Sequence, residues 1–197
     1  MTVHATVRPA LVLASTSPRR RDLVAQLGVE PVRVAAPDID ESPRTAELPR
    51  VYALRMAAEK AHAVALTTGE VALAGDTVVA AGRRILPRAA DADEVAWCLR
   101  LLSGRRHRVL TAVATIDDTG HLRSRLSESI VAFGPLGTAT IADYAANGDG
   151  VGKAGGYAIQ GGAGAFVRWM SGSYSGIVGL PLFETRALLV ASGVIDG

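Results

Sequence analysis

Apolar positions along this chain fall into two patterns that alternate from one end to the other. Nearly continuous apolar runs have the length of buried strands, whereas apolar residues three and four positions apart indicate helices with one buried face. The first pattern predicts strands at 11–14, 31–37, 71–82, 107–133 and 165–172. The second predicts helices at 18–28, 51–66, 91–104, 138–148 and 180–193. The turn "DDTG" within 107–133 is typical of a hairpin, and "DIDESPRTAELP" (38–49) reads as a polar loop.

The ends of the helices carry their own signals. Ser17 is a good N-cap, Pro18 suits the first helical position, and Gly28 suits the stop that follows. Asp91 can cap the helix at 91–104, which Gly104 ends. These signals support the boundaries that the apolar periodicity gives.

Strands that alternate with helices predict an α/β fold, and the hairpin predicts a mixed rather than an all-parallel sheet. The sequence contains no internal repeat, low-complexity block or clear linker. Hydrophobic residues make up 49% of the 197 residues, which is enough for one full core. We therefore expect a single domain over 1–197.

The overall composition excludes several classes of partner. A formal net charge of +2 is too small for a nucleic-acid tail or a membrane-surface patch, so nucleic-acid and membrane partners are not expected. No apolar stretch approaches the ~20 residues of a membrane span. The lone Cys98 excludes a disulfide framework and a cysteine-based zinc site, and it predicts a cytoplasmic location.

Three consecutive arginines, Arg19 to Arg21, stand in the first turn of the predicted helix at 18–28. The free N–H groups and the positive dipole end of a helix N-terminus already favour an anion. Adding Arg19 and Arg20 makes sense for a ligand with several negative charges, such as a polyphosphate. The alternative is a solvated basic face whose guanidinium groups pair with surface acids.

Carboxylates occur in two places that differ in character. Gly75-Asp76-Thr77 is expected to interrupt the buried strand at 71–82. The Asp76 carboxylate is costly there unless it is paired, hydrogen-bonded or bound to a metal; the alternative is a structural Asp that caps a turn after Gly75. The cluster in "PDIDES" could hold a hard cation such as Mg²⁺ or could be an acidic surface turn. Glu59 is placed on a helix, where pairing with Arg55 one turn earlier is the simpler explanation.

The segment "GDGVGKAGGYAIQGGAGAF" (148–166) is unusually rich in glycine, which lets backbone approach a ligand closely. Its glycine spacing formally matches a dinucleotide fingerprint, but the segment follows a helix and lacks a surrounding βαβ unit. It is not a Walker loop either, because Ala154 replaces the required Ser or Thr. Lys153 could hold a phosphate, and Gln160 could read a base edge with its amide.

Cations for phosphates together with carboxylates for a divalent metal are the composition expected of a metal-dependent enzyme acting on phosphate esters or phosphoanhydrides. Seven segments carry a closer resemblance: "LASTSPRRRDLVAQLG", "PDIDES", "AEKA", "AGDTVV", "LSGRRHRVLTAVA", "GKAGGYAIQG" and "YSGIVGLPLFET". In this order they resemble the Maf family of nucleoside triphosphate pyrophosphatases, from about Leu11 to Leu189.

The resemblance implies an elongated mixed α/β fold with helices on both sides of the sheet and two lobes around a central cleft, similar to inosine triphosphate pyrophosphatases. It implies hydrolysis of a nucleoside triphosphate to the monophosphate and diphosphate with Mg²⁺ or Mn²⁺. Asp76 matches the family's proton acceptor. The metal and water candidates are Glu41, Asp38, Asp40 and Glu59. The substrate-binding candidates are Ser15, Ser17, Arg19, Arg20, Lys60, Thr77, Arg88, Lys153 and Gln160.

The base preference also follows from the resemblance. Arg19, Thr77 and Gln160 match the type that prefers dTTP and UTP rather than the 7-methyl-GTP type. The sequence departs from the family at Pro87-Arg88-Ala89, where Gly-Lys-Pro is usual, so a forked Arg stands in place of a point-charge Lys. A 7-methyl-GTP pyrophosphatase and a non-catalytic nucleotide-binding regulator of cell division stay open as alternatives. A homodimer is compatible with the family, although no residue pattern demands it.

Overall fold

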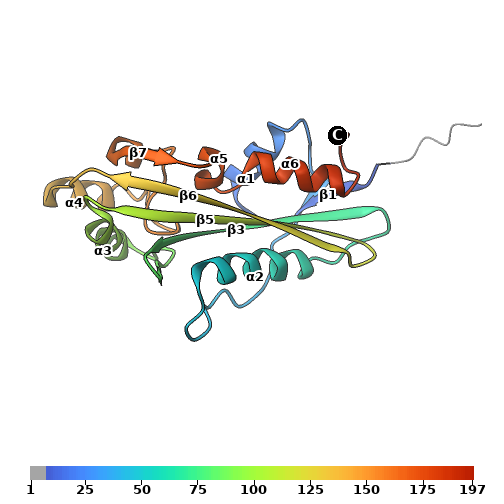
Figure 1. Cartoon of the computed structure of the whole chain (residues 1–197), viewed down its shortest axis with the longest axis horizontal. Helices are drawn as coiled ribbons and strands as arrows, with labels where there is room; N and C mark the ends of the chain where they lie inside the picture. The colour runs from blue at the N-terminus through green and yellow to red at the C-terminus, as the bar shows by residue number, and fades with distance from the viewer. Residues whose placement is uncertain (1–7) are drawn as a thin grey trace, which may run out of the picture.

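A computed structural model describes residues 8–197, so residues 1–7 of the expected domain lie outside the described residues. Three long antiparallel strands form its spine: β3 (Glu70–Ala81), β5 (Arg106–Asp117) and β6 (Leu122–Phe133). Figure 1 shows these strands running the length of an elongated molecule. The hairpin expected at "DDTG" is confirmed as the β5–β6 connection.

The sheet has seven strands in the order β2-β1-β3-β5-β6-β7, with β4 paired to β3. The shorter strands are β1 (Ala10–Leu13), β2 (Arg33–Val34), β4 (Arg84–Ile85) and β7 (Val167–Ser171). Strand β1 pairs in parallel with β2 and β3, whereas every other pairing is antiparallel. The sheet is therefore mixed, as the sequence predicted.

Helices cover both faces of this sheet, which confirms the predicted α/β class (Figure 1). The helix α2 (Pro49–His62) packs on β3 and β5 from one side. The opposite side carries α1 (Pro18–Ala25), α5 (Tyr174–Val178) and α6 (Leu182–Ala191). The helices α3 (Ala92–Leu102) and α4 (Thr138–Ala146) pack together at the end of the molecule where β7 lies, and a 3₁₀ turn, η1 (Gly162–Phe166), precedes β7. None of the helices in residues 8–197 is both long enough and apolar enough to span a bilayer.

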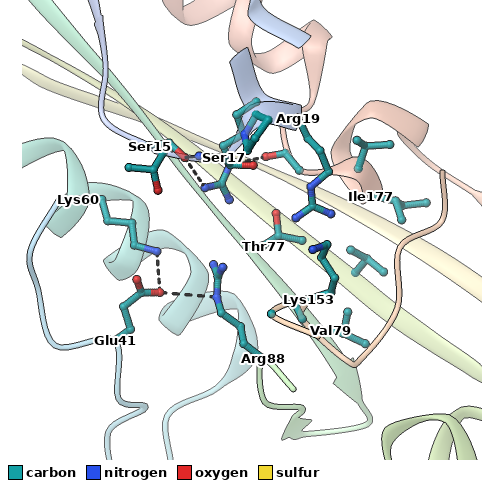
Figure 2. Close-up of a pocket in the computed structure, with 18 of the residues that line it drawn as sticks. Ser15, Ser17, Arg19, Glu41, Lys60, Thr77, Val79, Arg88, Lys153 and Ile177 are labelled. Atoms are coloured by element: carbon teal, nitrogen blue, oxygen red, sulfur yellow. Dashed lines mark hydrogen bonds and ion pairs between the residues drawn. The ribbon is translucent and has the colours of Figure 1, made fainter. Parts of the chain in front are cut away.

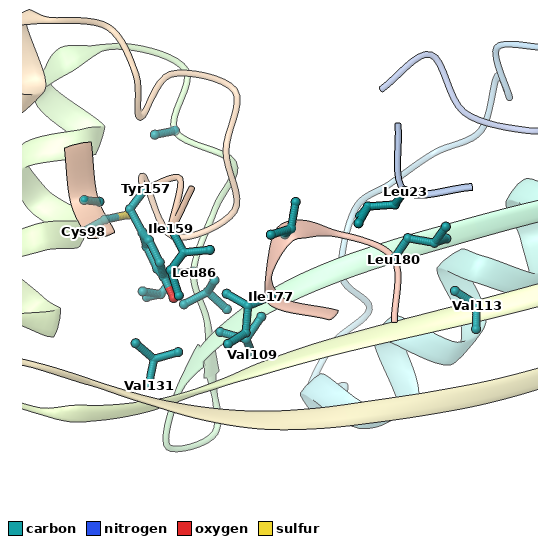
Figure 3. Packing of buried hydrophobic residues seen from close by; sticks show 14 of the residues in the cluster. Leu23, Leu86, Cys98, Val109, Val113, Val131, Tyr157, Ile159, Ile177 and Leu180 are labelled. Atoms are coloured by element: carbon teal, nitrogen blue, oxygen red, sulfur yellow. The ribbon is translucent and has the colours of Figure 1, made fainter. Parts of the chain in front are cut away.

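The two faces of the sheet bury separate apolar clusters, because side chains alternate along each strand. On β3, Val71, Leu73 and Val79 join the cluster under α1 and α6, part of which Figure 3 shows. Their neighbours Ala72 and Val78 join the cluster under α2. Alternate residues of β3 therefore pack on opposite sides of the sheet.

The prediction that Gly75-Asp76-Thr77 interrupts this strand was wrong. Strand β3 continues through all three residues, and Asp76 pairs with Ala112 of β5 in an unbroken ladder. The ladder partner supplies the hydrogen bonds that local sequence signals do not reveal. The continuation has a chemical consequence, because it sends the side chains of Asp76 and Thr77 to opposite faces of the sheet.

Most element ends agree with the sequence signals. Asp91 caps α3 by accepting a hydrogen bond from the Glu94 N–H at 2.9 Å. Ser17 occupies the N-cap position of α1, but its side chain makes no capping bond. Ser17 is one of the residues that line the cavity described next. The sequence did not predict α5, a helix of five residues that Ser173 caps through the Gly176 N–H.

Candidate active site

A cavity of about 340 Å³ lies where the start of α1, strand β3 and the glycine-rich loop (148–156) meet; we call it the main cavity (Figure 2). Nine residues that the sequence singled out line it: Ser15, Ser17, Arg19, Arg20, Glu41, Lys60, Thr77, Arg88 and Lys153. They come from segments spread over most of the chain. The fold therefore gathers the expected phosphate-binding groups around one space.

The three consecutive arginines have three different positions. Arg20 is buried, and it donates from Nε to the Gly179 carbonyl oxygen at 2.9 Å and from Nη1 to the Ser15 hydroxyl at 3.0 Å. Arg19 reaches into the main cavity (Figure 2). Arg21 points away and forms an exposed ion pair with Glu30 at 2.9 Å. The basic-face interpretation thus holds for Arg21 only.

Positive charge accumulates around the main cavity. Burial lowers the pKa of Arg20 to about 10, with Asp76 opposing this shift and Arg88 and Arg19 adding to it. Burial and the neighbouring Arg19 also lower the pKa of Lys153. Within residues 8–197, neither Arg19 nor Lys153 has a carboxylate within ion-pair distance. These cations repel one another, so an anionic ligand between them would relieve the repulsion.

Two carboxylates converge on one lysine at the edge of the cavity. Lys60 Nζ donates to Glu41 Oε2 and to Asp76 Oδ1, each at 2.7 Å. Arg88 Nη2 donates to the same Asp76 Oδ1 at 3.1 Å, and its Nε lies 3.8 Å from Glu41 Oε2. The Asp76 side chain is only 2% exposed and that of Lys60 is 4% exposed. The Lys60–Asp76 pair is therefore nearly dry, whereas the side chains of Glu41 and Arg88, 42% and 45% exposed, reach solvent.

Asp76 faces the α2 side of the sheet and borders a second cavity of about 230 Å³ rather than the main one. Glu41, Thr77 and Arg88 line both cavities, so the two spaces adjoin at this cluster. Thr77 faces the α1 side, where its hydroxyl lies 3.1 Å from that of Thr111. Strand β3 thus brings a carboxylate and a hydroxyl to one site from its two faces.

The other acidic candidates lie outside both cavities. Asp38 and Asp40 are exposed, and Asp40 Oδ1 accepts the Ser42 N–H at 2.8 Å in a local turn. Glu59 pairs with Arg55 at 3.1 Å and with Arg44 at 3.2 Å, which is the helix-surface arrangement that its spacing suggested. The structure therefore brings only Glu41 of the four expected metal residues to the site.

Gln160 is also exposed and does not line either cavity. In residues 8–197, no three His, Cys, Asp or Glu side chains come together in an arrangement that could hold a metal ion. Glu41 and Asp76 nevertheless bond one common atom, Lys60 Nζ. Two such carboxylates fit a Mg²⁺-type ion, which takes its remaining ligands from substrate phosphates and water.

The acidic loop (38–48) that carries Glu41 is tied to α2. Arg55 donates from Nε and Nη2 to the two oxygens of Glu47 at 2.7 and 2.6 Å, and the Tyr52 hydroxyl donates to the Glu41 carbonyl at 2.7 Å. The hydrogen bond from Arg55 lowers the pKa of Glu47 from 4.5 to about 2. This bidentate pair is nearly buried, with side chains 12% and 6% exposed. It fixes the backbone on which Glu41 stands.

Replacing Glu47 with Gln is expected to lower the free energy of unfolding by about 2 kcal/mol at pH 7. The folded-state pKa lies below the ordinary value, so the pair stabilises fully above pH 4.5 and loses its effect as the pH falls toward 2. Urea unfolding at several pH values should show the difference between Glu47→Gln and the parent shrink over that window. Glu128→Gln, in an exposed pair with Arg108, is the control and should cost under about 1 kcal/mol. A pH-independent difference for Glu47→Gln would contradict this account.

Several glycines of the glycine-rich loop are needed because the loop packs closely against its neighbours. A Cβ at Gly150 would collide with the Gly156 carbonyl oxygen and with Val95 of α3. Gly155 has φ +65°, and a Cβ there would lie 2.7 Å from Val79 of β3. Packing therefore requires glycine at these two positions, whereas Gly152 of the same loop lines the main cavity. Gly150 and Gly155 let the loop press against α3 and β3.

The same loop is bonded to the segment that carries the unusual arginine. The Gly152 N–H donates to the Ala89 carbonyl at 2.7 Å, and the Gly155 N–H donates to the Pro87 carbonyl at 2.9 Å. Arg88 and Ala154 form an isolated antiparallel bridge. The loop and residues 87–89 therefore act as one wall of the site, which brings Arg88 and Lys153 to the same cavity.

One end of the main cavity is apolar, a feature that the sequence analysis missed. It is lined by Val79, Val109, Tyr157, Ile177 and Val178. Figure 2 shows Val79 and Ile177 on the opposite side of the cavity from Glu41 and Lys60. The residues that line this end belong to apolar runs that read equally well as core. The main cavity thus has a charged end for phosphates and an apolar end that suits a planar ring.

The chain matches the family described as Maf-like protein over residues 10–192. A dTTP/UTP pyrophosphatase of Sphingopyxis alaskensis is 59% identical over 186 residues, which are 94% of this chain and 98% of the relative. A dTTP/UTP pyrophosphatase of Novosphingobium aromaticivorans is 58% identical over 187 residues, with 94% and 93% covered. A solved nucleoside-triphosphatase (dITP/XTP pyrophosphatase) from Mycobacterium abscessus is 22% identical with a TM-score of 0.44, over 64% of this chain and 75% of that one.

Proposed function

Because this chain belongs to the Maf family, we propose that it is a nucleoside triphosphate pyrophosphatase acting on dTTP and UTP. The enzyme cleaves the bond between the α- and β-phosphates and releases a monophosphate and diphosphate. The observation that carries this proposal is the main cavity, with cations at one end, an apolar lining at the other and a carboxylate pair at its edge. A nucleoside triphosphate has the matching distribution of charge.

We place the triphosphate at the charged end. The Ser15 and Ser17 hydroxyls donate to phosphate oxygens, and so does the Arg19 N–H, because the Arg20 and Arg21 amides already donate to the Ser17 carbonyl. The Arg19 side chain, which has no ion-pair partner among residues 8–197, supplies a further charge. Arg88 and Lys153 approach from the opposite wall. Arg20 contributes its positive charge from a buried position in the cavity wall, where bonds to Ser15 and Gly179 fix its guanidinium group. Gln160 lines neither cavity, and its role in reading the base stays a prediction.

Asp76 is the proposed proton acceptor for the attacking water. Lys60 and Arg88 both bond its Oδ1, whereas Oδ2 receives no hydrogen bond from the described residues. The two bonds fix the carboxylate and leave Oδ2 to orient water toward the α-phosphorus. The water oxygen forms the new bond to phosphorus, diphosphate leaves, and the water proton passes to Asp76 and then to solvent. Positioning of this kind lowers the barrier mainly by removing orientational freedom.

A divalent cation fits beside this carboxylate. Glu41 and Asp76 would hold Mg²⁺ or Mn²⁺ together with phosphate oxygens, and the ion would supply charge neutralisation on those oxygens. Because both carboxylates already bond Lys60, that side chain keeps them close together in the absence of an ion. Such substrates belong to the cytoplasm, which is where we place the enzyme. The homodimer stays a prediction.

Diphosphate release from a panel of nucleotides tests the function. We expect turnover of dTTP and UTP at least about tenfold above CTP, GTP and 7-methyl-GTP, and loss of turnover with a chelator that excess Mg²⁺ or Mn²⁺ reverses. Preference for 7-methyl-GTP would overturn the base assignment and keep the chemistry. Binding of nucleotides without turnover on any of them would overturn the enzymatic role.

A further inference from the structure

A buried polar pair lies at the apolar end of the main cavity. His107 Nε2 and the Tyr157 hydroxyl are 2.8 Å apart, and both residues are almost fully buried. Their rings stack edge to face with each other and with Phe133. In Figure 3 the oxygen end of the Tyr157 ring points toward the strands that carry Val109 and Val131, and Val109 lines the cavity. The pair is costly to bury, and the proposed chemistry at Asp76 does not use it.

The chemistry of His107 decides which way this hydrogen bond runs. Burial lowers the pKa of His107 to about 4, so the ring is neutral at physiological pH and carries one N–H. Its Nδ1 is buried and has no hydrogen-bond partner among the described residues. We assign the proton to Nε2, because Nδ1 is then a buried acceptor rather than a buried donor without a partner. In this tautomer His107 donates to the Tyr157 oxygen.

This direction leaves the Tyr157 hydroxyl proton without a use inside the described part of the protein. The hydroxyl accepts from His107 and has no other hydrogen-bond partner there. Because Tyr157 is among the residues that line the main cavity, a ligand there is the remaining candidate acceptor for this proton. The Tyr157 hydroxyl is then a fixed hydrogen-bond donor at the apolar end of the main cavity.

The strand register places this donor relative to the substrate. Val79 and Val109 pair across β3 and β5 on the face that lines the cavity. Thr77 precedes Val79 by two residues on β3, toward the charged end. His107 precedes Val109 by two residues on β5, which runs antiparallel, so the two polar groups flank the valine pair on opposite sides. A ring lying on the valines would present its far edge to Tyr157.

We propose that Tyr157, oriented by His107, determines base specificity. Its hydroxyl donates a hydrogen bond to the C4 carbonyl oxygen of uracil or thymine. In a pyrimidine nucleotide the C4 substituent lies on the edge away from the sugar, and the phosphates occupy the opposite end of the cavity. Cytosine presents an amino group at that position, which leaves the Tyr157 donor unpaired. The inference rests on the proposed function, because it names how that site selects its base.

Tyr157→Phe removes the donor and keeps the aromatic packing. We expect KM for UTP and dTTP to rise about fivefold with kcat nearly unchanged, and the ratio of kcat/KM for UTP over CTP to fall by a similar factor. Calorimetric titration, in which nothing is turned over, should show that the preference in Kd for UMP over CMP falls by a similar factor. Tyr144→Phe is the matched control, because its hydroxyl also bonds this segment, at the Ala158 N–H, but does not line the cavity. The control should keep the parent's UTP/CTP ratio.

The outcomes separate this inference from the proposed function. A parent protein without pyrophosphatase activity would overturn the function itself. A parent that prefers UTP, with a Tyr157→Phe variant that keeps the preference, would overturn only the role of Tyr157. If Tyr157→Phe lowers kcat/KM equally for UTP and CTP, Tyr157 has a structural role and the inference is overturned. The same holds if Tyr144→Phe changes the UTP/CTP ratio as much as Tyr157→Phe does.

Discussion

Asp76→Asn should lower kcat for dTTP and UTP by ~10²-fold or more, which is the usual size of a general-base contribution. Asparagine keeps the shape of the side chain, and its amide oxygen can still accept from Lys60 and Arg88. The variant therefore loses the proton acceptor and the negative charge without losing its place in β3. Because Asp76 is also one of the two carboxylates proposed to hold the divalent cation, the Mg²⁺ concentration needed for half-maximal turnover should rise.

The control for this variant is Asp143→Asn, an exposed carboxylate on α4 that lies outside both cavities. Steady-state diphosphate release at saturating dTTP, with Mg²⁺ present, compares the two variants. Thermal unfolding checks that Asp76→Asn is folded at the assay temperature. A folded Asp76→Asn enzyme within tenfold of the parent kcat would remove Asp76 from the reaction.

Local sequence signals predicted those parts of the fold that depend on neighbours along the chain. The Asp91 cap, the "DDTG" hairpin and the closing helix each follow from residues a few positions apart. The continuity of β3 does not, because the hydrogen bonds that carry it through Asp76 come from β5, more than thirty residues later. Polar residues within an apolar run were therefore mistaken for an interruption of the strand.

The site shows the same division. The sequence indicated Arg19 and Lys153 as phosphate-binding residues because a helix start and a glycine-rich segment are visible locally, whereas Lys60 followed from the family resemblance alone. It did not separate Glu41 from its neighbours Asp38 and Asp40, since only the anchoring of the acidic loop on α2 decides which carboxylate meets Lys60.

The apolar end of the main cavity was missed for a different reason. A valine or tyrosine that lines a pocket has the same sequence signature as one that fills a core. Val79 and Tyr157 lie in runs that are buried in either case. Only the packing of α5 and the glycine-rich loop over β3 leaves space at these side chains. A pocket is a property of that packing, and no single segment encodes it.

Lys60→Met should lower the free energy of unfolding by about 3 kcal/mol, because it breaks a buried ion pair from one side. The ammonium group is the shared donor to Glu41 and Asp76, both at 2.7 Å. Its loss leaves the almost fully buried Asp76 carboxylate with Arg88 alone, at 3.1 Å, and leaves two carboxylates close together without the cation between them. Methionine is close to lysine in length, so lost packing contributes little. Urea unfolding at pH 7 measures the change.

The double variant Lys60→Met/Asp76→Asn tests the cause. If an uncompensated buried charge produces the loss, neutralising Asp76 as well should restore much of the stability, so that the double variant is more stable than Lys60→Met alone. Activity should not return, since the proton acceptor is then absent. Additive losses in the double variant would mean that the two side chains stabilise the fold independently, and the buried pair would lose its role as the common anchor of Glu41 and Asp76.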